Sequence, residues 1–234
     1  MPVPVAATPA PVSWSRPLGR DDVRVRVTDR HDGDLAVGLP TDDLEVRRRT
    51  IVDLPWSWLR QVHGARVVAV RDDAVAGLEA DALVTDRPGV VLAVHTADCA
   101  PVALVSAEGP IGVVHAGWRG VAAGVLPACV TAMRSLGAAE IEAWLGPCIH
   151  PGCYEFGADD LDEVAARLGP GVRGRTAGGA TALDLPAAVE ASLGDAGVPL
   201  VAASPACTAC DPRWYSHRAR GDLGRQALVA WIRP

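Results

Sequence analysis

Three side chains that commonly bind metals occur where an apolar run of this sequence is interrupted. His63 lies in LRQVHGARV, Cys99 in HTADCAPV and His115 in IGVVHAGWRG. Reactive groups are often placed at the ends of strands, because the sheet behind them is rigid. Two imidazoles and one thiolate suit zinc, and three protein ligands leave a fourth tetrahedral position open. Each residue taken singly would more often be structural, and it is the combination that indicates a catalytic metal site.

His95 complicates this set. It precedes Cys99 by four residues, and in a strand both side chains would lie on the same face. We therefore expect His95 to be a further ligand, a donor to a ligand, or a sheet residue hydrogen-bonded to a neighbouring loop.

Four more cysteines fall in two close pairs, Cys148 with Cys153 and Cys207 with Cys210. Together they could form a structural zinc site with four thiolates. The first spacing is loose and a long stretch of chain separates the pairs, which weighs against that site. Cys129 lies within a helix-like segment, and we expect it in the core.

A glycine-rich turn, GWRGVAAG (117–124), leads from a strand-like run into a helix-like one. Backbone N–H groups at a helix N-terminus together with Arg119 would make a pocket for an anion such as phosphate. The turn is not a Walker A loop, because no Gly-Lys-Ser/Thr follows it.

The composition excludes several functional classes. The net charge is −6, and non-specific nucleic-acid binding needs a basic surface. The apolar runs are too short and interrupted to span a bilayer. The beginning, MPVPVAATPAPVSW, lacks the pattern of a signal peptide. We therefore expect a cytoplasmic protein that binds neither nucleic acid nor membrane, with its six cysteines reduced.

The elements that must hold these residues follow from hydrophobic periodicity. Strands are predicted over 23–27, 65–70, 81–85, 89–96, 101–106, 111–117, 141–146, 200–206 and 227–232, and helices over 120–137, 158–168 and 184–193. Pro127 must lie at a kink or near a helix end. The central strands are apolar throughout and are expected to be buried on both faces. A β-rich centre with later helices favours an α+β or layered α/β fold.

We expect residues 1–20 to be an extended arm and residues 21–234 to be a single catalytic domain. Residues 173–182 (RGRTAGGATA) are predicted to be a surface loop.

The motifs LRQVHGARV, ADALVT, HTADCAPV, VVHAGWRG, GPCIHPGCYE and CTACDP, in this order, resemble those of the YfiH-type laccase-domain family, also called the polyphenol oxidase or multicopper-oxidase-like family. The resemblance covers roughly residues 55–234. It implies a layered α/β/β/α sandwich, similar to the catalytic domain of cytotoxic necrotizing factors, and a monomer. It also implies that His63, Cys99 and His115 bind zinc.

The resemblance implies a substrate class as well. The family phosphorolyses adenosine, inosine and methylthioadenosine to a free base and a pentose 1-phosphate, and it deaminates adenosine. The small-molecule partners would then be purine nucleosides and phosphate.

The roles of neighbouring residues follow from this chemistry. Deamination needs a general acid/base, for which Asp98 beside the thiol is one expectation and Glu155 another. Phosphorolysis needs a phosphate site, for which we expect Arg119 and the N–H groups after Gly117.

Three residues are expected to contact the substrate in other ways. Trp118 or Tyr154 would stack on the purine, and Gln61 in the QVHG motif would bind the nucleoside.

The chain departs from the family before residue 55. Relatives carry a segment like SLNLG followed by an Asn-Arg pair, whereas this chain has DLAVG (34–38). The asparagine of that segment falls at Ala36, and the Asn-Arg pair has no clean equivalent beyond the nearby Arg47–Arg49. Nucleoside binding is therefore expected to differ here.

Other readings of the same residues stay open. Six histidines are too few for a true multicopper laccase, although copper could replace zinc and cause adventitious polyphenol oxidation. Cys99 could be a metal-free nucleophile with His115 as its base, or the zinc could act on amides such as cell-wall precursor peptides. A further alternative is a binding module without catalysis.

Overall fold

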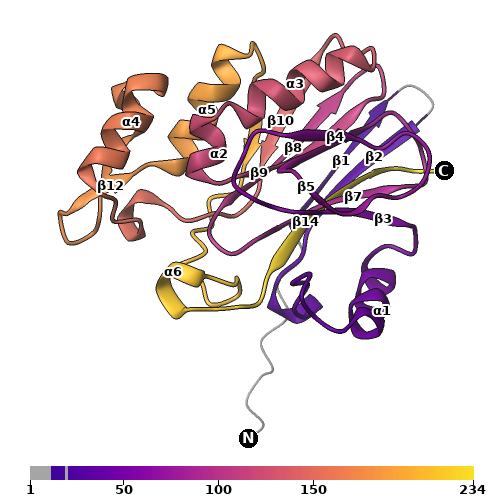
Figure 1. The fold of residues 1–234 in the computed structure, drawn as a ribbon, viewed down its shortest axis with the longest axis horizontal. Helices are drawn as coiled ribbons and strands as arrows, with labels where there is room; N and C mark the ends of the chain where they lie inside the picture. The colour runs from indigo at the N-terminus through magenta and orange to yellow at the C-terminus, as the bar shows by residue number, and fades with distance from the viewer. Residues whose placement is uncertain (1–11, 19–20) are drawn as a thin grey trace, which may run out of the picture.

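Two six-stranded sheets pack face to face in the structure, a computed structural model that describes residues 12–18 and 21–234 (Figure 1). The first sheet has the strand order β1 (Val12–Leu18), β2 (Asp21–Val27), β14 (Gln226–Ile232), β7 (Val91–Thr96), β3 (Trp56–Arg60) and β5 (Ala76–Glu79). The second has the order β13 (Leu200–Ala203), β10 (Ile141–Leu145), β8 (Ala100–Ser106), β9 (Ile111–Ala116), β6 (Ala82–Thr85) and β4 (Val67–Ala69).

Helices cover the two outer faces of this sandwich. The first sheet carries α1 (Thr41–Ile51), and the second carries α2 (Trp118–Ala122), α3 (Val125–Ser135), α4 (Ala158–Leu168) and α5 (Leu185–Asp195) (Figure 1). Short 3-10 helices span Arg30–Asp32, Pro151–Cys153 and Pro170–Val172, and α6 (His217–Arg220) precedes the last strand. The predicted α/β/β/α layering is therefore confirmed.

The alternation of side chains explains how the layers adhere. In β7, Leu92 and Val94 pack between the sheets, whereas Val91 and Ala93 pack toward α1. Strands β8 and β9 are buried along their whole length, because the second sheet is covered on both sides. Their continuous apolar sequence reflects that burial, as predicted.

The long helix predicted over 120–137 is two helices. Gly124 has a φ of 86°, a left-handed conformation that glycine adopts without strain, and the chain breaks there between α2 and α3. Pro127 lies in the first turn of α3, where its missing N–H costs nothing.

The loop predicted over 173–182 is wrong for half of its residues, because only 176–180 form a turn. β11 (Arg173–Arg175) and β12 (Thr181–Leu183) form an antiparallel hairpin. Ala182 and Leu183 are buried, while glycine and arginine in β11 hide the alternation from sequence inspection.

The expected N-terminal arm falls partly within the described residues. Residues 12–18 form β1, which pairs with β2 along its length, whereas residues 1–11 and 19–20 lie outside the described residues. No helix in the described part of the chain is long and apolar enough to cross a membrane.

Candidate metal centre and its pocket

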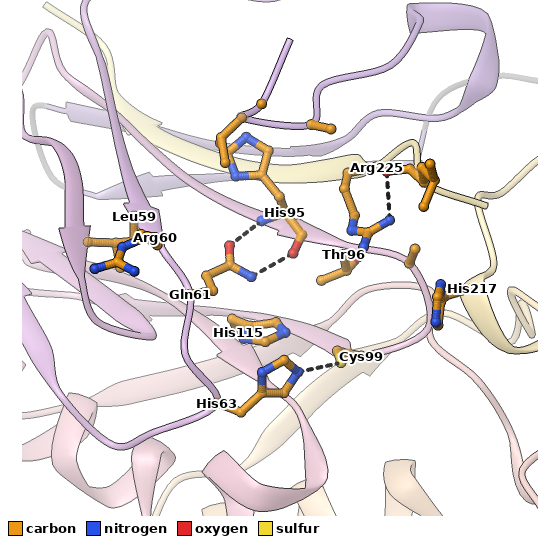
Figure 2. Close-up of a pocket in the computed structure, with 15 residues that line it drawn as sticks. Leu59, Arg60, Gln61, His63, His95, Thr96, Cys99, His115, His217 and Arg225 are labelled. Carbon is orange, nitrogen blue, oxygen red and sulfur yellow. Dashed lines mark hydrogen bonds between the residues drawn. The ribbon is translucent and has the colours of Figure 1, made fainter. Parts of the chain in front are cut away.

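His63, Cys99 and His115 come together at one end of the sandwich (Figure 2). Their ligand atoms lie within 4.8 Å of one another, and His63 Nε2 is 3.8 Å from Cys99 Sγ. The two imidazoles meet edge to face with their centroids 4.8 Å apart. His115 is buried, Cys99 is partly exposed and His63 is exposed, which leaves the cluster open to solvent on one side.

His115 is placed by the register of two strands. β6 and β9 are antiparallel with Ala82 opposite Val114, which puts Asp81 opposite His115 on the face between the sheets. The backbone N–H of His115 donates to Asp81 O at 2.8 Å, and His115 Nδ1 lies 2.8 Å from Asp81 Oδ1. The other ring nitrogen, Nε2, is therefore the one available to the cluster.

The same carboxylate holds the loop that carries His63. The backbone N–H groups of His63 and Gly64 donate to Asp81 at 2.9 and 2.7 Å. His63 has a φ of 59°, an uncommon conformation that persists only when surrounding contacts hold it. Burial opposes the charge on Asp81, but the hydrogen bonds from His115 and Gly64 outweigh it and lower its pKa.

Cys99 follows a strained turn between β7 and β8. Asp98 has a φ of 100°, and its buried carboxylate accepts hydrogen bonds from Thr208 Oγ1 and from the backbone N–H of Arg218, each at 2.7 Å. Its carbonyl accepts from Ile149 N–H at 2.9 Å. Asp98 therefore ties three segments together and sets the direction of the thiol that follows it.

Cys99 and His115 form an ion pair when no metal is bound. Burial disfavours the thiolate, but the charge and hydrogen bond of His115 lower the pKa of Cys99 to about 6. Burial likewise disfavours the imidazolium, but Cys99 and Asp81 raise the pKa of His115 to about 9. Between these values the thiolate and the imidazolium coexist, which is the state of an activated nucleophile.

Gly117 is in close contact with the cluster. A Cβ at this position would be 2.7 Å from His63 Cδ2 and 3.3 Å from Cys99 Sγ. Its φ of −70° is ordinary, and so the requirement for glycine is one of space alone.

A cavity of about 520 Å³ opens above the three residues. Its wall includes Gln61 just after β3, Thr96 at the end of β7, and His217 and Arg225 from the C-terminal region (Figure 2). Ala36–Gly38 from the N-terminal region complete this part of the wall. This volume is in the range of small-molecule sites.

At the edge of this pocket, the side chain of Gln61 makes the hydrogen bonds that a strand backbone would make. Its Nε2 donates to His95 O and its Oε1 accepts from His95 N, both at 2.7 Å (Figure 2). The side chain thus continues the β3–β7 pairing after β3 has ended at Arg60. Both ends of the amide are used in this way, which makes Gln61 a positioning residue.

The remaining predicted site residues lie elsewhere. Trp118 and Arg119 line a separate, smaller cavity, where the guanidinium of Arg119 stacks 4.2 Å above the Trp118 ring. Tyr154 packs edge-on against Phe156 and under Arg218.

Glu155 is exposed, and its carbonyl accepts from the Arg218 side chain. Neither Glu155 nor Asp98 is on the wall of the main cavity. The structure therefore brings Gln61, His63, Cys99 and His115 to the pocket, and not the expected acid/base, phosphate and stacking residues.

His95 does not share a face with Cys99, and that expectation is wrong. β7 ends at Thr96 and the turn at Asp98 redirects the chain. The ring of His95 points away from the cluster (Figure 2), and both of its nitrogens are buried with no hydrogen-bond partner in the described structure. Burial and the nearby charge of Arg48 lower its pKa to about 3, which leaves it neutral.

The donor set fits a metal ion. Two imidazoles and a thiolate converge, and the histidine at the back gives its second nitrogen to a buried carboxylate, the arrangement that orients most metal-bound histidines. Asp81 was not singled out from the sequence, although a carboxylate at the start of the apolar strand ALVT was a usable signal. His217 and Arg225 had no such signal, because only the fold brings them to the pocket.

Comparison with known proteins gives a consistent result. A family model described as multi-copper polyphenol oxidoreductase laccase matches residues 32–233. A purine nucleoside phosphorylase of Mycobacterium bovis is 42% identical over 179 residues, which cover 75% of this chain and 71% of that protein. A purine nucleoside phosphorylase of Xylella fastidiosa is 42% identical over 192 residues, with the same coverage.

Solved structures show the same fold. The hypothetical protein YfiH of Bacillus licheniformis has a TM-score of 0.80 at 28% identity, covering 89% of this chain and 92% of its own. A Neisseria meningitidis protein has a TM-score of 0.82 at 28% identity, covering 96% and 99%.

Proposed function

On the premise that this chain belongs to the multi-copper polyphenol oxidoreductase laccase family, we propose that it is a zinc-dependent purine nucleoside phosphorylase. Its substrates are adenosine, inosine and methylthioadenosine, and deamination of adenosine is its second activity. The observation that carries the proposal is the His63–Cys99–His115 cluster, fixed by Asp81 at the floor of a nucleoside-sized cavity. Relatives that carry the phosphorylase name supply the substrate class.

The three residues would hold the zinc, and a bound zinc ion supplies Lewis acidity at that position. Asp81 keeps Nε2 of His115 directed at the cluster and fixes the loop of His63. Gly117 leaves the space into which the ring of His63 fits. The chain's own contribution is therefore a preorganised site whose groups need not move during reaction.

In phosphorolysis, a phosphate oxygen forms a bond to the anomeric carbon as the bond from that carbon to the purine breaks. Arg225 is placed to attract the phosphate, since its guanidinium is fixed on the pocket wall by the carbonyls of Asp222, Leu223 and Gly224. A fixed cation loses little freedom when the anion binds.

The departing base takes up a proton. His217 is on the wall outside the metal cluster, and an imidazole has ring nitrogens that can donate and accept a hydrogen bond. We assign the proton transfer to His217, because Asp98 and Glu155 are directed elsewhere.

A multicopper oxidase mechanism has no support in these residues. The cluster offers three ligands, and a single such site cannot hold several coppers. Cu(II) binds such sites more tightly than zinc, and oxidation of phenols by a copper-loaded form would be adventitious.

A second function is favoured by the ion pair between Cys99 and His115. A thiolate with a pKa of about 6 beside an imidazolium is the arrangement of a cysteine hydrolase. Without metal, the site would attack an amide such as one in a cell-wall precursor peptide.

We further propose that residues 21–234 act as one catalytic domain, as a cytoplasmic monomer. The pocket wall supports a single domain, because it combines Ala36 from near one end of the sequence with Arg225 from near the other.

The test compares the zinc-loaded protein, a chelator-treated sample and His115→Ala, each incubated with adenosine with and without phosphate. Asp73→Asn, on an exposed loop, is the control. We expect adenine release that needs both zinc and phosphate, and inosine formation that needs zinc alone. Zinc-loaded protein without turnover would contradict the proposal, and amide cleavage by the chelated sample, blocked by iodoacetamide, would favour the hydrolase.

A further inference from the structure

Cys153, Cys207 and Cys210 form a second thiol cluster away from the pocket. Their sulfur atoms all lie within 4.8 Å of one another, and those of Cys153 and Cys210 are 3.1 Å apart. Cys153 ends the 3-10 helix Pro151–Cys153, and the other two lie in the turn that follows β13. None of the three is on the wall of the main cavity.

The backbone holds this cluster firmly. Cys148 and Cys207 form a parallel bridge, and Thr208 N–H donates to Cys148 O at 3.0 Å. Cys210 N–H and Asp211 N–H both donate to Cys207 O, at 3.2 and 3.0 Å. The two segments are thus fixed before any metal binds.

Cys148 is not a member of the cluster. Its side chain is buried among the apolar residues between the second sheet and its helices, and burial raises its pKa far above the ordinary value. The four-thiolate site considered from the sequence is therefore wrong to include Cys148, and the cluster has three thiols.

Cys207 is surrounded by donors that suit a thiolate. It is partly buried, and the backbone N–H groups of His150, Cys210 and Ala209 are directed at its sulfur. The His150 N–H lies 3.4 Å from the sulfur. Amides of a C-x-x-C turn directed at the first sulfur preorganise it as an anion.

The other two thiols lie still closer to each other. The sulfur atoms of Cys153 and Cys210 are 3.1 Å apart and share a hydrogen bond. A second and third negative charge at this spot are disfavoured unless a cation neutralises them, and thiolates select zinc and other soft metals.

We propose that Cys153, Cys207 and Cys210 form a second, structural zinc site, separate from the site in the pocket. Three thiolates would supply three of the four tetrahedral positions, and Cys210 is exposed, so a water molecule could supply the fourth. The metal would join the 3-10 helix to the turn after β13.

This second site supports the pocket through one hydrogen bond. Thr208 lies between the two cysteines of the turn, and its hydroxyl donates to Asp98, the residue before Cys99. The metal would therefore stabilise the segment that sets the direction of the Cys99 thiol, without contacting the substrate.

The test uses reduced protein in which the pocket site has been removed by the double substitution His63→Ala and Cys99→Ser. We expect this variant to retain one zinc per chain by elemental analysis, and to give a thiolate-to-metal charge-transfer band when Co²⁺ replaces the zinc. Adding Cys207→Ser or Cys210→Ser should abolish both signals. Cys148→Ala is the matched control from the same motifs and should keep both signals.

Three results would overturn the proposal. They are a reduced double variant that binds no metal, a zinc that survives both Cys207→Ser and Cys210→Ser, and an intact mass showing Cys153 and Cys210 joined as a disulfide under mild reductant. Circular dichroism of Cys210→Ser, whose side chain is exposed, separates loss of the ligand from loss of the fold. None of these measurements uses nucleoside turnover. The test of the second zinc site therefore does not depend on whether the protein is a phosphorylase.

Discussion

Asp81, the residue before β6, lies opposite His115 of β9 and is joined to it twice, by a backbone hydrogen bond and by a contact of 2.8 Å between Asp81 Oδ1 and His115 Nδ1. The carboxylate also accepts from the backbone of His63. One buried side chain therefore orients two of the three groups that would bind a metal.

Replacing that carboxylate should weaken metal binding without abolishing the site. Asp81→Asn keeps the shape but removes the charge and one acceptor, and outer carboxylates of this kind are worth about 10–100-fold in affinity. Competition with a chromophoric chelator measures the change. An affinity equal to that of Asp73→Asn would show that Asp81 has no part in orienting the ligands.

Gly117→Ala should remove the metal while leaving the fold. Its Cβ would lie 2.7 Å from His63 Cδ2, and the exposed ring of His63 is the group that can move away. The control is Gly157→Ala, which also precedes a helix with an extended backbone and has nothing within 4 Å of the added Cβ. We expect similar unfolding temperatures for both variants and reduced zinc content in Gly117→Ala only. Equal zinc contents would refute the steric argument.

In chelator-treated protein, the alkylation rate of Cys99 should have its pH midpoint below that of an ordinary thiol. Its pKa of about 6 is below that of an ordinary thiol, about 8.5. The thiolate, which is the reactive form, is therefore lost as the pH falls through about 6 and is already abundant at neutral pH. Alkylation by iodoacetamide, followed by peptide mass spectrometry over pH 5 to 9, measures this, and zinc should protect the thiol. Cys129 is the internal control, because burial raises its pKa. A midpoint near that of an ordinary thiol would disprove the ion pair.

Phosphate dependence should separate two cationic residues. Arg119 stacks on Trp118 at a separate cavity, and Arg119→Gln should leave the KM for phosphate near the wild-type value. Arg225→Gln should raise it by about 10–150-fold, since hydrogen bonds to charged groups contribute about 1.5–3 kcal/mol. Initial rates at varied phosphate concentration measure the KM for phosphate of both variants. A higher KM for Arg119→Gln alone would support the anion site expected from the glycine-rich turn.

Ala36 offers a test of the departure from the family pattern. It is on the pocket wall, at the position where the family resemblance leads us to expect an asparagine. Ala36→Asn should lower the KM for nucleosides by about 2–10-fold, the effect of one added hydrogen bond of about 0.5–1.5 kcal/mol. Val46→Asn serves as the comparison, because Val46 is exposed and is not on the pocket wall. An unchanged KM for Ala36→Asn would mean that this position does not contact the nucleoside.

The layers and the three clustered residues could be predicted from the sequence for different reasons. Strands such as β8 are buried throughout, which leaves an unbroken apolar run that is easy to recognise. His63, Cys99 and His115 each interrupt such a run, and a polar group at the end of an apolar strand is conspicuous.

The rest of the site depends on contacts between distant segments. Asp98 looked like a free acid beside the thiol, but Thr208 and the Arg218 backbone occupy both of its oxygens. Arg225 belongs to no sequence motif, and only the fold places it on the pocket wall. Local patterns do not contain such pairings, because they are decided by strand order and register.

The loop from Gln61 to Gly64 has a mechanical consequence. At one end, the side chain of Gln61 is hydrogen-bonded to β7 of the first sheet, and at the other, Gly64 is hydrogen-bonded to Asp81 beside β6 of the second. The loop therefore connects the two sheets across the open end of the sandwich, and it carries His63. Separation of the two sheets at this end would displace His63 first. Heating should therefore inactivate the site at a lower temperature than the one at which the sandwich unfolds.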